Sequence, residues 1–210
     1  MTVNLQSITI PASTPNPKGL IVALHGWGAN AEDLTGLTPY LNLPEYTYIF
    51  PDAPFPYPYS PNGRAWYDLR VENMYAGLTQ TRETLLSWLT NLERETGIPL
   101  SRTILSGFSQ GGAMTLDIGL RLDLAGLVCM SGYLHPELEK QPKPDFTSFP
   151  SVLMMHGQQD TVVPLGAAHK AKSLLESWGV NVEYHEFSAS HEINLQMLEK
   201  LRNFIQRRLP

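Results

Sequence analysis

Short apolar runs alternate with longer stretches of helical periodicity along nearly the whole chain. The run at residues 20–24 is fully apolar and contains branched side chains, as is typical of a strand buried on both faces of a parallel sheet. The strands predicted on this basis are 20–24, 46–50, 103–106, 126–130, 151–155 and 180–187.

Helices are predicted between these strands wherever apolar residues recur every three or four positions. The longest carries Leu78, Leu85, Leu86, Leu89 and Leu92 on one face and ends at Gly97. The others start after a capping Asn30 or span 110–122, 165–178 and 192–208. This alternation predicts an α/β fold, with a mostly parallel sheet flanked by helices on both faces. A chain of 210 residues is expected to form a single domain, 1–210.

Two proline-rich segments interrupt the alternation. Residues 51–62 contain five prolines among aromatic residues, and residues 136–150 contain four. Both are short, and predicted core strands continue on either side of each. They are therefore expected to be surface loops at the rim of a pocket rather than linkers between domains.

Composition and charge exclude several classes of partner. The chain is 42% apolar and 17% charged, as in ordinary globular proteins, and its net charge is -5. Its 15 basic residues form no stripe, which argues against nucleic acid as a partner. Cys129 is the only cysteine, so neither an intrachain disulfide nor a multi-cysteine metal site is available, and it is expected to be a small buried apolar residue.

The sequence gives no targeting signal. Its first residues lack a basic region and a long apolar stretch, so no secretory signal is expected. No window of 18 apolar residues occurs, so no integral membrane segment is expected. A cytoplasmic location is the resulting expectation.

Residues 107–111 form the most informative motif of the chain, a G-x-S-x-G sequence centred on Ser109. A predicted strand precedes this motif and a predicted helix follows it, which is the context of a nucleophile elbow. In such a turn, side chains two residues before and after the serine would collide. Gly107 and Gly111 remove both collisions and leave the Ser109 hydroxyl exposed at the edge of the sheet.

A serine nucleophile needs a neighbouring base, which is normally a histidine. In doubly wound hydrolases the histidine follows the serine and the acid in the chain. His169 lies in a predicted helix and His185 in a predicted strand, so structural roles are favoured for both. His191 follows the last predicted strand, at the edge of the sheet where ligands bind, and is the predicted base.

The acid must orient the imidazole from the end of a neighbouring strand. Asp160 follows the strand predicted at 151–155 and is the predicted acid. Asp145 competes, but it lies in a proline-rich segment with no strand to fix it. Asp117 and Asp123, in or after the helix that follows the elbow, are expected to be solvated.

Ester hydrolysis also needs hydrogen-bond donors for the oxyanion of the tetrahedral intermediate. The backbone N–H of Gln110, directly after the nucleophile, is one predicted donor. The second is the N–H of Trp27, in the loop that follows the strand at 20–24. His25 is expected to hold this loop rather than to catalyse.

Several motifs, in this order, resemble the phospholipase/carboxylesterase family, which includes the acyl-protein thioesterases. They cover almost the full chain: LHGWG at 24–28, PDAP at 51–54, GFSQGGA at 107–113, GQQDTVVP at 157–164, and His191. The resemblance implies an α/β-hydrolase fold without a large cap domain, and neither metal nor cofactor. It also implies a catalytic triad of Ser109, Asp160 and His191, with Trp27 and Gln110 at the oxyanion hole.

Two departures bear on the substrate. Thioesterase members commonly have leucine at the position of Trp27 and aspartate at that of Ala29, and the 55–62 loop is closer to the bacterial carboxylesterase branch. Because tryptophan narrows the acyl site, the expected activity is that of a serine carboxylesterase acting on short- to medium-chain esters through an acyl-serine.

Two alternatives stay open. The first is an acyl-protein thioesterase or lysophospholipase that acts on long acyl chains and takes a lipid ester instead of a small-molecule one. Candidate substrate-binding residues for such a groove are Trp66, Tyr133 and Leu134, with Tyr67 and Met74 beside them, although each is equally interpretable as core. The second alternative is a hydrolase fold that only binds.

Overall fold

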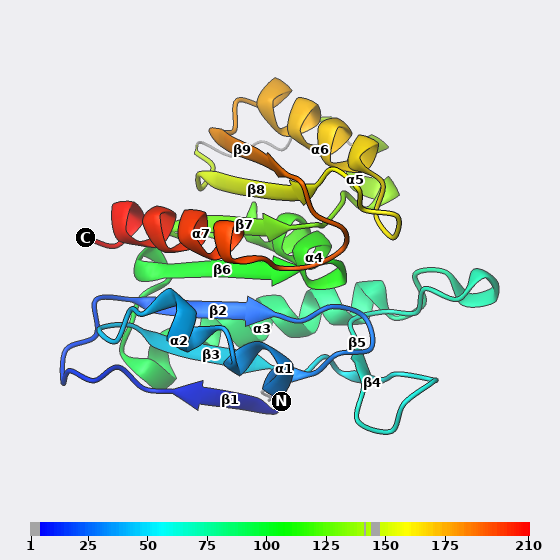
Figure 1. The fold of residues 1–210 in the computed structure, drawn as a ribbon. Helices are drawn as coiled ribbons and strands as arrows, with labels where there is room; N and C mark the ends of the chain where they lie inside the picture. The colour runs from blue at the N-terminus through cyan, green and yellow to red at the C-terminus, as the bar shows by residue number, and fades with distance from the viewer. Residues whose placement is uncertain (1–4, 141, 144–147) are drawn as a thin grey trace.

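The computed structural model describes residues 5–140, 142–143 and 148–210. Its centre is a seven-stranded sheet in the order β1-β3-β2-β6-β7-β8-β9 (Figure 1). All neighbouring strands are parallel except β1, which pairs antiparallel with β3 at one edge. The strands are β1 (Ser7–Ile10), β2 (Leu20–Leu24), β3 (Thr47–Pro51), β6 (Thr103–Phe108), β7 (Gly126–Met130), β8 (Val152–Gly157) and β9 (Val182–Phe187).

Helices cover both faces of the sheet, as predicted. One face packs against α3 (Leu78–Thr96), α4 (Gln110–Gly119) and α6 (Leu165–Ser177). The other packs against α1 (Ala31–Thr35), α2 (Thr38–Leu41) and α7 (Leu195–Arg208). The short helix α5 (Pro136–Lys140) follows β7.

Successive residues of the central strands enter opposite cores. In β7, Leu127 and Cys129 pack on the α3 side, whereas Val128 and Met130 pack on the α7 side. This alternation explains why β2 and β7 carry no polar side chain at any position. Cys129 is buried, as expected from the sequence.

Local sequence determines where several helices begin and end. The Asn30 side chain accepts the N–H groups of Glu32 and Asp33, and the Asp33 side chain accepts the N–H of Asn30, which caps α1. Gly97 has φ +71 and ends α3 with a hydrogen bond to the Glu93 carbonyl. Both boundaries were predicted.

The segment between β3 and α3 projects from the body of the protein (Figure 1). It holds a two-stranded hairpin, β4 (Phe55–Pro56) with β5 (Arg64–Ala65), and the 3-10 turn η1 (Val71–Asn73). A second such turn, η2 (Leu100–Arg102), precedes β6. The mostly parallel sheet with helices on both faces is an α/β-hydrolase fold, and among the described residues no insertion forms a large cap. The single-domain organisation stays a prediction.

In the described part of the chain, no helix has the length and apolar character needed to cross a membrane.

Candidate active site

Ser109 occupies a tight turn between the end of β6 and the start of α4. Its φ is +54, a left-handed conformation that is rare for a residue with a side chain. A Cβ on Gly107 would lie 2.2 Å from the Gly111 carbonyl oxygen, and one on Gly111 would lie 2.2 Å from the Leu24 carbonyl oxygen. Glycine is therefore required at both positions, as the motif predicted.

The fold brings Ser109, His191 and Asp160 together from three different strand ends. His191 Nε2 lies 2.9 Å from Ser109 Oγ, and His191 Nδ1 lies 2.7 Å from Asp160 Oδ2. Asp160 follows β8, and His191 lies in the loop between β9 and α7. Parallel strands end at one edge of a sheet, so residues far apart in sequence converge there.

The Asp160 carboxylate is fixed by further hydrogen bonds. Its Oδ1 accepts the backbone N–H groups of Val162 at 2.9 Å and Val163 at 2.8 Å. Burial alone would raise the pKa of Asp160, but the hydrogen bonds from His191 and from these N–H groups outweigh it and lower the pKa. An ionised Asp160 accepts the Nδ1–H of His191, which leaves the Nε2 lone pair directed at the serine hydroxyl.

The loop after β2 approaches the nucleophile closely. A Cβ on Gly26 would lie 3.5 Å from the Cβ of Ser109. The N–H of Ala29 donates to the Gly26 carbonyl at 3.2 Å, which closes a tight turn around Trp27. The two predicted oxyanion donors, Trp27 and Gln110, therefore belong to segments that both lie next to Ser109.

His25 holds this turn and does not reach the reacting atoms. Its Nε2 accepts the N–H of Ala53 at 3.1 Å, so its Nδ1 carries the proton and donates to the Gly26 carbonyl at 2.7 Å. Burial lowers the pKa of His25, which favours this neutral form. Of the other histidines weighed, His169 is exposed and bonds Glu186, and His185 bonds its strand neighbour Glu183.

The expectation for Asp117 is wrong. Its carboxylate is buried in α4 and bonds His135 Nδ1 at 2.5 Å and Arg82 Nε at 2.7 Å. Every residue of α4 is buried, so the helix has no solvated face on which an aspartate can lie. Asp123 is exposed, as expected, and Asp145 lies outside the described residues.

The candidate substrate-binding residues separate into two groups. Trp66 is 0% exposed and Leu134 is 5% exposed, so both belong to the core and offer little or no surface to a substrate. The indole N–H of Trp66 is used internally, in a 2.9 Å hydrogen bond to the His25 carbonyl. Tyr133 is partly exposed, and Met74 is exposed on the projecting segment.

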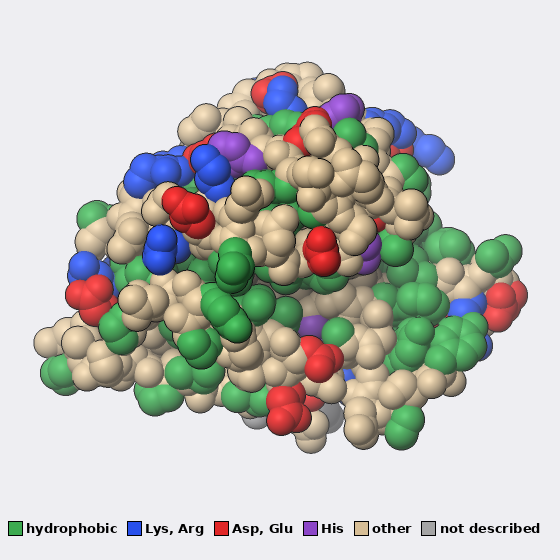
Figure 2. Space-filling model, viewed as in Figure 1, with side chains coloured by type: hydrophobic (Ala, Val, Ile, Leu, Met, Phe, Trp, Pro, Cys, Tyr) green, Lys and Arg blue, Asp and Glu red, His purple; other side chains and the backbone are tan. Residues whose placement is uncertain are grey.

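A cavity of about 440 Å³ lies between Trp27 and the projecting segment, and its lining includes Trp27 but none of Ser109, Asp160 and His191. Its wall is mostly apolar, and an ion pair between Asp68 and Arg70, 2.6 Å apart, lies on its lining. Figure 2 shows hydrophobic side chains gathered over this projecting part of the molecule. The 51–62 loop lines this pocket, as predicted, whereas no pattern in the sequence pointed to the Asp68–Arg70 pair.

The family follows from comparison with known proteins. A family model described as phospholipase/carboxylesterase matches residues 5–209. The chain belongs to this family. It is a serine hydrolase, with the esterase or thioesterase activity characteristic of the family.

A thioesterase, a lysophospholipase-like protein and an esterase are each similar to most of the chain. Acyl-protein thioesterase 1 of Neurospora crassa is 32% identical, covering 89% of this chain and 82% of that protein. Lysophospholipase-like protein 1 of Mus musculus is 27% identical, covering 97% and 94%. The crystal structure of esterase PE8 superposes with a TM-score of 0.90 at 30% identity, covering 99% of this chain and 100% of that one.

Gly107→Ala tests the close approach at the elbow. The added methyl group would meet the main chain of α4 at 2.2 Å, so we expect a loss of several kcal/mol in the free energy of unfolding, comparable to the larger single-substitution effects of about 4 kcal/mol. The measurement is urea unfolding followed by circular dichroism.

Gly166→Ala is the matched control, because it lies in α6 with no atom within 4 Å of the new Cβ. Alanine favours helix over glycine by about 0.8–1 kcal/mol, so this variant is expected to be slightly stabilised. Equal stability of the two variants would contradict the close approach at the elbow.

Proposed function

We propose that the protein is a serine carboxylesterase that hydrolyses short- to medium-chain acyl esters through an acyl-serine on Ser109. The observation that carries the proposal is the chain of hydrogen bonds from Ser109 Oγ through His191 to the Asp160 carboxylate. This is the arrangement in which a histidine can take the serine proton while an aspartate stabilises the resulting imidazolium.

The reaction would proceed in two halves. In the first, Ser109 Oγ attacks the ester carbonyl while His191 Nε2 takes its proton, and the imidazolium then protonates the departing alcohol. In the second, His191 takes a proton from the water that attacks the acyl-serine, and the imidazolium returns a proton to Ser109 Oγ as the carboxylic acid leaves. Asp160 stays ionised throughout and holds the imidazole in one orientation.

The negative oxygen of each tetrahedral intermediate would be stabilised by the N–H groups of Trp27 and Gln110. Gln110 directly follows Ser109, and the loop that carries Trp27 approaches it closely. Both donors are main-chain N–H groups, which keep their protons throughout the reaction. Losing one such donor in other enzymes lowers kcat by about 10²–10³.

The preference for shorter acyl groups rests on Trp27. Its ring lines the cavity and packs edge-on against Tyr57, with ring centroids 5.0 Å apart. Tyr57 is in turn packed closely over Gly28 and Gly63, where added Cβ atoms would lie 2.9 Å from its ring. This wall of aromatic rings limits how far the indole can move away from an acyl chain.

A thioesterase or lysophospholipase acting on long acyl chains is the second candidate. It is favoured by the names of the relatives from Neurospora crassa and Mus musculus, and by an apolar cavity of about 440 Å³. The proposed substrate is accordingly a small-molecule or lipid ester. The cytoplasmic location and the lack of a cofactor stay predictions.

Initial rates on p-nitrophenyl esters of increasing acyl length test the proposed function. We expect turnover to peak at short to medium chains and to disappear in Ser109→Ala, which removes the attacking oxygen and leaves the fold intact by circular dichroism. A long-chain peak would favour the second candidate. Unchanged turnover in Ser109→Ala would show that Ser109 is not the nucleophile.

Trp27→Leu tests the role of the indole in limiting chain length. We expect the optimum of the same ester series to move to longer chains, with kcat/KM for long esters rising about 10-fold, the lower end of the effect of one methylene group in an apolar pocket. Tyr40→Leu, at an aromatic side chain that is 61% exposed on α2, is the control and should leave the profile unchanged. An identical profile in Trp27→Leu would contradict this role.

A further inference from the structure

The side chain of Gln110 is clamped by the main chain of two consecutive residues. The Trp66 N–H donates to Gln110 Oε1 at 2.9 Å, and Gln110 Nε2 donates to the Tyr67 carbonyl at 2.8 Å. Gln110 is 1% exposed, so this carboxamide has no contact with solvent that would replace either bond. Both ends of the carboxamide are thus fixed to a segment far from Gln110 in sequence.

The same segment also holds the loop that carries Trp27. The indole N–H of Trp66 donates to the His25 carbonyl at 2.9 Å. The Trp66 indole also packs against the His25 imidazole, with ring centroids 5.2 Å apart. The hydroxyl of Thr81, on α3, donates to the Trp66 carbonyl. Trp66 and Tyr67 therefore contact both segments that carry the proposed oxyanion donors.

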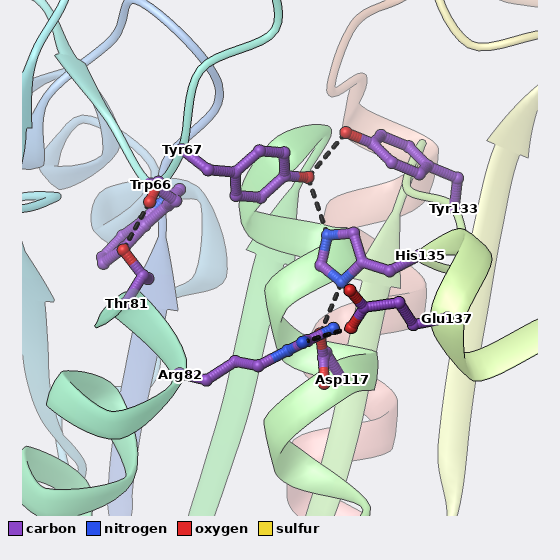
Figure 3. A network of polar contacts seen from close by, with 8 residues as sticks. All are labelled: Trp66, Tyr67, Thr81, Arg82, Asp117, Tyr133, His135 and Glu137. Carbon is purple, nitrogen blue, oxygen red and sulfur yellow. Dashed lines mark hydrogen bonds and ion pairs between the residues drawn. The ribbon is translucent and has the colours of Figure 1, made fainter. Parts of the chain in front are cut away.

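The side chain of Tyr67 is anchored in turn to α4, the helix that begins at Gln110. Its hydroxyl lies 2.9 Å from His135 Nε2, and His135 Nδ1 lies 2.5 Å from Asp117 Oδ2 (Figure 3). Because Asp117 and Gln110 belong to the same helix, the hydrogen bonds form a closed ring. We call this ring, made by Gln110, Tyr67, His135 and Asp117, the Tyr67 brace.

Electrostatics keeps the Asp117 carboxylate of the brace ionised. Burial alone would raise the pKa of Asp117, but hydrogen bonds and positive charge from His135 and Arg82 outweigh it and lower the pKa. The ionised carboxylate accepts the Nδ1–H of His135, and His135 Nε2 hydrogen-bonds the Tyr67 hydroxyl. The Tyr67 hydroxyl also hydrogen-bonds the Tyr133 hydroxyl, whose oxygen lies 2.6 Å away.

We propose that the Tyr67 brace positions the oxyanion hole, with Gln110 acting through its side chain and Tyr67 and His135 as positioning residues. This inference rests on the proposed function of Ser109 and of the two main-chain donors. Preorganised donors stabilise a transition state only when they are held in place, and a misplacement of about 1 Å costs about 10² in rate. The brace restrains the first residue of α4, whose N–H is one donor. Trp66, the residue before Tyr67, holds the His25 carbonyl, two residues before the other donor.

Gln110→Met tests the brace directly, because it removes the clamped carboxamide but keeps the main-chain N–H and the side-chain length. We expect kcat on the preferred ester to fall by 10-fold to 10²-fold while KM changes by less than about twofold, the pattern of an interaction made in the transition state. The affinity for an alkylboronic acid, which binds serine as a tetrahedral anion, should fall by the same factor as kcat.

Gln158→Met is the matched control. Gln158 is exposed in the turn after β8, where its Nε2 bonds Glu186 at 3.1 Å, and its substitution should leave all three quantities unchanged. Tyr67→Phe provides a second variant that leaves the main-chain clamp in place and removes only the hydroxyl, with its hydrogen bonds to His135 and Tyr133. We expect a smaller loss in kcat and in boronate affinity, again with KM maintained.

The brace would be overturned if Gln110→Met had the same kcat and boronate affinity as the wild type. It would also be overturned if the variant changed only KM. If Gln110→Met does not fold, Tyr67→Phe becomes the test of the proposal. Values of kcat and boronate affinity in Tyr67→Phe equal to those of the wild type would then overturn it. The proposed function fails separately, in the wild-type protein, if turnover there does not depend on Ser109. An active wild type beside an equally active Gln110→Met leaves the proposed function standing and refutes the brace alone.

Discussion

The close main-chain approach at the elbow is the constraint on which the rest of the structure depends. Residues Gly107 and Gly111 allow the start of α4 to lie against the ends of β2 and β6. Ser109 accepts a left-handed backbone there, a conformation that costs of order 1–3 kcal/mol. Its N–H bonds the Met130 carbonyl at 2.9 Å, so the neighbouring strand β7 helps to hold this conformation. The hydroxyl is thereby exposed at the edge where His191 and Asp160 arrive.

The sequence predicted the parts of the fold that depend on local pattern. The central strands and the long helices follow from apolar runs and helical periodicity, and Asn30 and Gly97 were correctly placed as helix boundaries. The edge strand β1 was missed because it is short and mostly exposed, so it has no apolar run. The short helices α2 and α5 were missed because four or five residues are too few to show a period.

The sequence predicted the site residues whose positions follow from the order of strands along the chain. It misjudged the residues whose environment depends on how distant segments pack together. Ser109, Asp160 and His191 meet because each follows a strand of one parallel sheet. Asp117 was wrongly expected to be solvated, because its partner His135 comes from a loop that follows the next strand. Trp66 is apolar enough for either a groove or a core, and only the fold shows that its indole N–H is used in the core.

Covalent labelling with a fluorophosphonate, followed by mass spectrometry of the intact protein and of its peptides, tests the central claim most directly. The claim is that His191 and Asp160 activate Ser109 as the nucleophile. It predicts one equivalent of label on the peptide that contains Ser109, a label lost in Ser109→Ala and strongly slowed in His191→Ala. Label at another residue, or equal labelling of Ser109→Ala, would contradict it.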